Sequence, residues 1–423
     1  MTLAATFLGG AKSRLLPPSI PLRFFASAAS FHVLMWIVLF IGAYQSASFR
    51  GGLGPTLAAV HLLTLGVLTT TAIGASVQLL PVATRRSLMA IWPIRLVFWL
   101  VVPGLTLLVF GMYRAEFAVL IFAAVTTTVG LLMFAVLLAN NLWRAASLPI
   151  VAAYGWAALT CLVLLTVLGI ALAADYELGV LPNHGGIALT HMILGGFGFM
   201  GLLALGFSHI LVPMFALAAA PAKAPSIAGF VLAIAAIFLG TLGALASHTI
   251  ALVGAGLLGL GAAAIHLRLM LRVLKTGMRK RLGFSFLLIR VAWVMLPVTV
   301  LVGLASLFGY AGANGPTLFG LFLLVGWLLT FLLGILQRIL PFLASMHMSN
   351  ATGATPPLMS ELTSSTALKL HAACHGLAFI LLVVSIGTDT IALTQIGSAI
   401  GLIGAVSFAW FTINITRRVL VAY

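Results

Sequence analysis

The chain has 423 residues, of which 63% are hydrophobic and only 6% are charged, and this composition excludes a soluble domain of that length. The formal net charge of +16 does not indicate nucleic-acid binding, because the basic residues stand in short segments between apolar runs. The two cysteines fall inside apolar runs, so no disulfide framework is implied.

Apolar runs of about 20 residues, long enough to cross a hydrocarbon core of about 30 Å, recur along the whole chain. They predict an all-α polytopic membrane protein of twelve transmembrane helices. The segment before the first run lacks a small-residue cleavage site after a short apolar core, so we expect a retained cytoplasmic lead-in. The predicted spans are 24–46, 57–81, 92–112, 117–140, 149–173, 187–215, 225–247, 250–272, 284–308, 316–343, 367–387 and 391–414.

The basic residues predict the orientation of these spans. With the N-terminus inside, the outer loops hold only Arg50 and Arg114 among the basic residues. The inner loops hold Lys12, Arg14, Arg23, Arg85, Arg86, Arg144, Lys223, Lys275, Arg279, Lys280, Arg281, Arg417 and Arg418. An excess of Lys and Arg on the cytoplasmic side indicates an even number of spans with both termini inside. We therefore expect a multi-pass protein of a bacterial inner (cytoplasmic) membrane.

An internal repeat links the second, sixth and tenth predicted spans. Each contains two glycines eight residues apart and a proline seven residues further on: Gly66, Gly74 and Pro81; Gly198, Gly206 and Pro213; Gly326, Gly334 and Pro341. Glycines at this spacing lie near one helix face and let a neighbouring helix approach closely. The repeat predicts three quasi-equivalent four-helix units within one membrane domain, roughly 24–140, 149–272 and 284–414.

Histidines are the candidate functional residues, because no carboxylate falls in the middle of a predicted span whereas most of the ten histidines lie in or beside one. His61 and His191 enter early in the second and sixth spans, at nearly equivalent points of the repeat. His371 and His375 are spaced i, i+4 and so share one helix face. Imidazole at such depth can ligate haem iron or copper.

These four histidines are therefore predicted metal or haem ligands, and His209 is a further cofactor-binding candidate. The alternative for each is a hydrogen bond between helices, which is the commoner role of a lone membrane histidine. A b-type haem takes axial ligands from opposite sides, so at most one of His371 and His375 would serve a given haem. Arg338 could pair with a haem propionate, or extend to the inner headgroups.

Topology and local sequence together resemble subunit I of the haem–copper oxidase superfamily. The stretch His61-Leu-Leu-Thr-Leu-Gly, ending in Gln78-Leu-Leu-Pro-Val, is similar to the second helix of C-type oxidase relatives. The resemblance implies that His61 ligates a low-spin b haem. It also implies, by span alone, that His191 occupies the place of a copper ligand.

Two departures limit what this resemblance implies. The tenth span has no histidine in its membrane part where oxidases carry His-x-His, and only His248 stands near the seventh span where they carry a His-His pair. An oxygen-reducing centre is therefore not expected. The chain looks more like the short, divergent members of the superfamily or, by class alone, the NnrS-type haem- and copper-containing membrane proteins.

The function expected from the sequence is haem b binding, with copper as a further candidate, in respiratory or nitrogen-oxide redox metabolism. Whether the chain is itself an enzyme stays open. Its expected partners are the lipid bilayer, haem and a redox partner or another membrane subunit. The alternatives are a membrane carrier for haem, copper or a small molecule, and a non-catalytic subunit of a larger complex. The scarcity of buried carboxylates predicts poor proton pumping.

Overall fold

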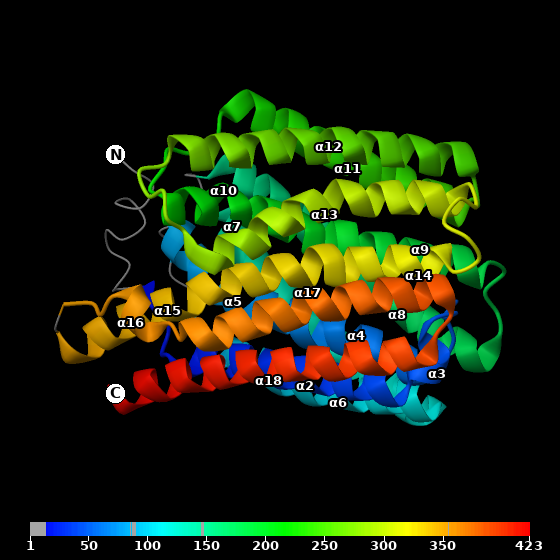
Figure 1. Cartoon of the computed structure of the whole chain (residues 1–423), viewed down its shortest axis with the longest axis horizontal. Helices are drawn as coiled ribbons and strands as arrows, with labels where there is room; N and C mark the ends of the chain where they lie inside the picture. Colours follow the sequence, from blue (N-terminus) through cyan, green and yellow to red (C-terminus); the bar gives the residue numbers. More distant parts are fainter. Residues whose placement is uncertain (1–13, 85, 87–89, 145–147, 354) are drawn as a thin grey trace.

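A computed structural model of the chain describes residues 14–84, 86, 90–144, 148–353 and 355–423, and this part is helical without any strand. Twelve of its helices are long and apolar enough to cross a membrane, which confirms the predicted all-α polytopic fold. They lie lengthwise beside one another in a single bundle (Figure 1). The beginning of the first span and the C-terminus lie at the same end of this bundle, as an even number of spans requires.

Most spans are single α-helices: α2 (Ser19–Ile41), α6 (Trp92–Arg114), α7 (Phe117–Trp143), α8 (Pro149–Leu178), α11 (Lys223–Leu245), α12 (Thr249–Thr276), α13 (Gly283–Leu307), α17 (Ser365–Thr388) and α18 (Ile391–Val421). The first predicted span ends earlier than expected, because the chain bends at Gly42 before the short α3 (Ala43–Ser46). A Cβ on Gly42 would lie 2.3 Å from the Pro55 Cβ, so this bend needs a glycine. The short α16 (Met359–Leu362) links the tenth and eleventh spans.

The second, sixth and tenth spans are composite, and each contains a π-helical segment. They are α4–η2–α5 (Pro55–His61, Leu62–Thr69, Thr70–Thr84), α9–η3–α10 (His184–Met192, Ile193–Gly201, Leu202–Ala216) and α14–η4–α15 (Gly315–Leu321, Phe322–Leu329, Thr330–Thr352). A π-helix is rare and usually marks a functional or strained place in a helix. Segment η4 packs against both η2 and η3, so the three wide turns meet inside the bundle.

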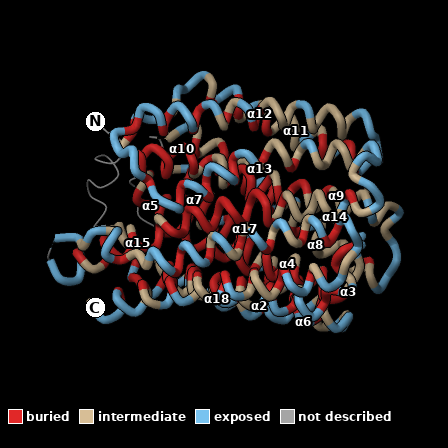
Figure 2. The backbone as a smooth tube through the Cα atoms, viewed as in Figure 1, coloured by how far each residue is buried: buried red, intermediate tan, exposed pale blue. Residues whose placement is uncertain are grey.

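These three composite spans form the interior of the protein. In their most apolar windows 72%, 89% and 67% of residues are buried, against at most 44% in any other span. Figure 2 shows the same division, with buried backbone in the middle of the bundle and exposed backbone on the outer helices. The outer helices present large apolar side chains outward, such as Phe122, Phe238 and Ile250, as lipid contact requires.

The same packing order recurs three times around the bundle. Taken in chain order, the twelve spans form three groups of four. The fourth span of each group contacts the first span of the next: α7 contacts α8, α12 contacts α13 and α18 contacts α2, which closes the ring. The composite span of each group packs on the first span of its own group, as α5 on α2, α10 on α8 and α15 on α13. The division of the chain at 24–140, 149–272 and 284–414 stays a prediction.

The repeated glycines make the close helix contacts that their spacing predicts. A Cβ added at Gly66 or Gly74 would lie 2.8 or 2.9 Å from the Cβ of an α2 phenylalanine. At Gly198 and Gly206 it would lie 2.7 Å from atoms of Cys161 and Tyr154 on α8. Real Cβ atoms do not approach so closely, so helix α2 or α8 packs directly against glycine backbone in the first two copies.

Candidate metal site

The predicted histidines fall into separate groups in the fold. His61 is the last residue of α4 and His191 lies in the last turn of α9, so each lies in the first segment of an interior span. His371 and His375 lie on α17, where they meet His32 of α2. His209 of α10 lies apart from both, beside His266 of α12.

The His61–His191 pair is near enough for the two rings to interact electrostatically. His61 Nδ1 lies 3.0 Å from the Leu57 carbonyl oxygen, one turn earlier on its own helix. His191 Nδ1 lies 3.1 Å from the Leu165 carbonyl oxygen on α8. A carbonyl accepts only from Nδ1–H, which leaves the lone pair of each ring on Nε2. This is the tautomer that metal-binding histidines usually adopt, although both rings are only half-buried.

The deepest group, which we call the His32–His371 cluster, consists of His32, His371 and His375. Ring centroids are 6.2 Å apart between His32 and His371 and 6.0 Å apart between His371 and His375. None of the three side chains is more than 5% exposed. Phe408 of α18 covers the cluster from one side, with its ring centroid 5.1 Å from that of His371. Three imidazoles from two helices thus share one apolar compartment.

Hydrogen bonds hold the rings at the edges of the cluster. Trp36 donates its indole N–H to His32 Nε2 at 3.1 Å, so His32 accepts at that atom. The Thr330 hydroxyl donates to the Val325 carbonyl at 2.8 Å, and His375 Nε2 lies 2.7 Å from the same hydroxyl oxygen. Because the hydroxyl has a single hydrogen, His375 Nε2–H is the donor of the second bond. His375 is therefore engaged with protein through Nε2.

Two imidazole nitrogens of the cluster have no hydrogen-bond partner among the described residues: His32 Nδ1 and His371 Nε2. The Gln337 amide of α15 lies 3.5 Å from His371 Nδ1, and the Gln337 carbonyl oxygen is also unpaired. Exchanging the amide oxygen and nitrogen, which are assigned only from such contacts, lets His371 Nδ1–H donate to that oxygen. His371 Nε2 then carries a free lone pair inside the protein.

Small residues on α18 make room for this arrangement. A Cβ on Gly401 would lie 2.5 Å from the Trp36 ring, and one on Gly404 would lie 2.9 Å from the Cys374 Cβ. The hollow that the cluster borders has no room for a water molecule. A metal ion bound about 2.0–2.1 Å from each nitrogen places two ring centroids roughly 6–6.5 Å apart. The 6.2 Å between the centroids of His32 and His371 is compatible with one ion held in a near-linear arrangement, whereas a porphyrin fits only if α2 and α17 separate.

Arg338 does not join the cluster. Its Nε donates to the Ser285 hydroxyl at 2.7 Å, and its guanidinium lies 5.7 Å from the centre of the Phe286 ring, both on α13. The neighbouring Gln337 is the residue that faces His371. No three His, Cys, Asp or Glu side chains of the described residues lie together as a metal-ligand set, so an ion in the cluster would have two imidazole ligands.

The remaining histidines lie at helix ends. His184 bonds Asp175 Oδ2 at 2.7 Å through Nδ1, and His248 caps α12 by accepting from the Ala251 N–H. His347 lies 3.5 Å from the Tyr423 hydroxyl. The ligands predicted from the sequence did not include His32, and Trp36, Thr330 and Gln337 were not identified, because contacts between spans are not visible in a single sequence.

Comparison with known proteins adds no relative to these observations. No family model matches the chain, and no curated protein matches it at a significant level. The resemblance to haem–copper oxidase subunit I therefore stays a prediction that rests on topology and on the residues of the second span.

Proposed function

We propose that this membrane protein binds a transition metal through buried imidazoles, with His32 and His371 as the ligands in the His32–His371 cluster. The metal is a copper ion or haem iron. The protein serves redox or nitrogen-oxide chemistry in a bacterial cytoplasmic membrane. The observation that supports this most directly is the pair of unpaired imidazole nitrogens in the His32–His371 cluster.

Unpaired nitrogens at this depth destabilise the protein unless a ligand engages them. A buried donor or acceptor without a partner costs about 1–3 kcal/mol, and proteins satisfy almost all such groups. The cluster carries two unpaired imidazole nitrogens, on rings whose centroids are 6.2 Å apart. His371 Nε2 offers its lone pair directly, and Gln337 holds His371 in that tautomer. His32 Nδ1 carries the ring proton while Nε2 accepts from Trp36, and it becomes a ligand when metal binding displaces that proton.

The surroundings favour a redox metal over a structural one. Structural zinc takes four ligands, commonly including thiolates, and the described residues offer no such set here. Imidazole suits copper and iron, and a dry apolar shell controls the reduction potential of either. When bound, the metal would supply one-electron chemistry. The protein residues would hold it, fix the ring orientation through Trp36 and Gln337, and exclude water.

The two forms of the metal differ in what they demand of the fold. Copper fits the ring spacing as packed, whereas haem iron requires α2 to move away from α17. The His61–His191 pair is the second place where either metal could be held, because each ring contacts a carbonyl through Nδ1 and keeps its lone pair on Nε2. A soluble or membrane redox partner would exchange electrons with the protein at one of its two faces.

The test is metal analysis and visible spectroscopy of the protein purified in detergent without chelators. We expect copper, or a Soret band with b-type reduced peaks, at one or more equivalents per chain. His32→Gln and His371→Gln should each remove the metal from the cluster, whereas His347→Gln, a buried histidine outside the cluster, should not. Folded protein that contains neither copper nor iron, even after reconstitution with Cu(I) or haemin, would overturn the proposal. The carrier and scaffold alternatives would then stand.

A further inference from the structure

A second buried pair of imidazoles lies on the other side of the bundle. It consists of His209 on α10 and His266 on α12, whose ring centroids are 6.0 Å apart. Trp293 of α13 lies 6.4 Å from His266, and Tyr154 of α8 lies 5.5 Å from His209, centroid to centroid. Figure 1 shows α10, α12 and α13 on the opposite side of the bundle from α2 and α18.

His209 and His266 lie on the second and fourth spans of the middle four-helix unit. The equivalent positions on the second and fourth spans of the last unit lie beside the His32–His371 cluster. His209 and Gln337 both stand three residues after the second repeated glycine. His266 and Phe408 both stand 17 residues after the first residue of their helices. Gln337 and Phe408 contact His371 in the first cluster. At the two equivalent positions, the middle unit has the imidazoles of His209 and His266.

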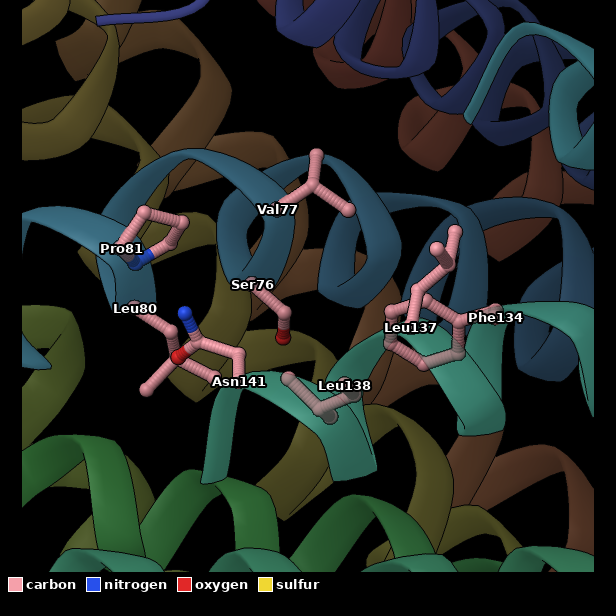
Figure 3. A pocket seen from close by; sticks show the side chains of 8 residues that line it. All are labelled: Ser76, Val77, Leu80, Pro81, Phe134, Leu137, Leu138 and Asn141. Carbon is pink, nitrogen blue, oxygen red and sulfur yellow. The ribbon is translucent and has the colours of Figure 1, made fainter. Parts of the chain in front are cut away.

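The remaining group has no histidine at these positions, and it serves as an internal comparison. Its equivalents are Val77 on α5 and Phe134 on α7, which line a hollow with room for about one water molecule. Figure 3 shows the Ser76 hydroxyl pointing into this hollow and Asn141 beside it. Apolar side chains thus occupy the positions in the first unit that are equivalent to those of His209 and His266. Packing alone therefore does not require histidines there.

The polar atoms of the pair have too few protein partners. His209 donates Nδ1–H to the Leu205 carbonyl at 2.9 Å, and its Nε2 has no partner in the described part of the chain. His266 Nδ1 and the Trp293 indole N–H also have none among the described residues. The three side chains are only 4%, 5% and 2% exposed. Ring centroids 6.0 Å apart are compatible with a single ion about 2.0–2.1 Å from one nitrogen of each ring.

We propose that His209 and His266 bind one Cu(I) ion at a second site, separate from the His32–His371 cluster. A singly charged ion costs less to bury than a divalent one, because the penalty for burying charge is large. Met270, fully buried, follows His266 by one turn on the same face of α12, and thioether sulfur favours Cu(I). Trp293 closes the compartment from α13.

The experiment counts copper in the purified full-length protein after anaerobic loading with Cu(I) and removal of excess by a Cu(I) chelator. Each variant introduces the residue type that stands at the equivalent position of another unit. His209→Gln introduces the glutamine found at Gln337, and His266→Phe introduces the phenylalanine found at Phe408 and Phe134. We expect two coppers at the two buried clusters of the wild type, a loss of one in either variant, and a loss of the other in His371→Gln. X-ray absorption should show nitrogen ligands, with sulfur added at the second site.

The outcomes separate this inference from the proposed function. If His371→Gln loses its copper but His209→Gln and His266→Phe keep the wild-type amount, the second site is refuted and the first stands. If only the α10–α12 variants lose copper, the second site stands and copper binding at the His32–His371 cluster is refuted. Melting temperatures of all variants, measured without metal, exclude a general loss of fold as the cause. No copper in wild-type protein of normal stability refutes the second site and points to a bridging water.

Discussion

Replacing Gly401 by alanine tests how the His32–His371 cluster is held together. In an ordinary helix this change stabilises by about 1 kcal/mol, because alanine has the higher helix propensity. Here the new Cβ would lie 2.5–2.6 Å from three atoms of the Trp36 ring, which is 1% exposed and so has nowhere to move. The substitution therefore forces either the ring or α18 out of place.

The expected change in the free energy of unfolding is the sum of an overpacking cost and the cost of a lost hydrogen bond, less the gain in helix propensity. Overpacking a dense core costs about 1–3 kcal/mol, and leaving the Trp36–His32 bond unmade costs about 1–3 kcal/mol more. After the helix-propensity gain, we expect a net loss of about 1–5 kcal/mol in the free energy of unfolding. The matched control is Gly376→Ala on α17, where an added Cβ meets no atom within 4 Å.

Unfolding in mixed detergent, followed by tryptophan fluorescence and circular dichroism, measures both variants against the wild type. Gly401→Ala should unfold at a lower denaturing-detergent fraction, whereas Gly376→Ala should be neutral or slightly more stable. Equal stability of the two alanine variants would refute the close packing of Trp36 against α18. It would also remove the stated reason for the position of His32.

Three further changes test other contacts. Thr330→Val leaves the Nε2–H of His375 without an acceptor and should cost about 1–3 kcal/mol in the same unfolding assay; an unchanged midpoint would show that this bond is not made. Gly206→Ala places a Cβ 2.7 Å from that of Tyr154, so we expect a loss of about 1–3 kcal/mol, and stability equal to the wild type would contradict the α8–α10 contact. Asp175→Asn weakens the 2.7 Å bonds that hold the loop between α8 and α9, so amide exchange there should quicken while exchange in the bundle stays constant.

The spans and their order were predictable because each depends on local composition. Apolar length identifies a membrane helix without knowledge of its neighbours. The glycine–proline repeat correctly identified the contact faces of Gly66, Gly74, Gly198 and Gly206. The π-helical segments were not predictable, because their wide turns arise where three interior spans meet and no residue type specifies them.

The histidine groups were only partly predictable for a related reason. His371 and His375 share a helix face, which the i, i+4 spacing shows directly. Their neighbour His32 lies more than 300 residues away on the first span, and only the closure of the ring of helices brings it near. Arg338 drew attention through its charge, whereas the neutral Gln337 beside it is the residue that faces the cluster.

The central claim concerns what lies between His32 Nδ1 and His371 Nε2. The most direct measurement is an experimental density map of the protein purified without chelators, with anomalous data collected at the copper and iron edges. We predict a strong anomalous peak about 2 Å from both nitrogens. Rings bonded only to water or to neighbouring protein atoms, with no such peak, would contradict it.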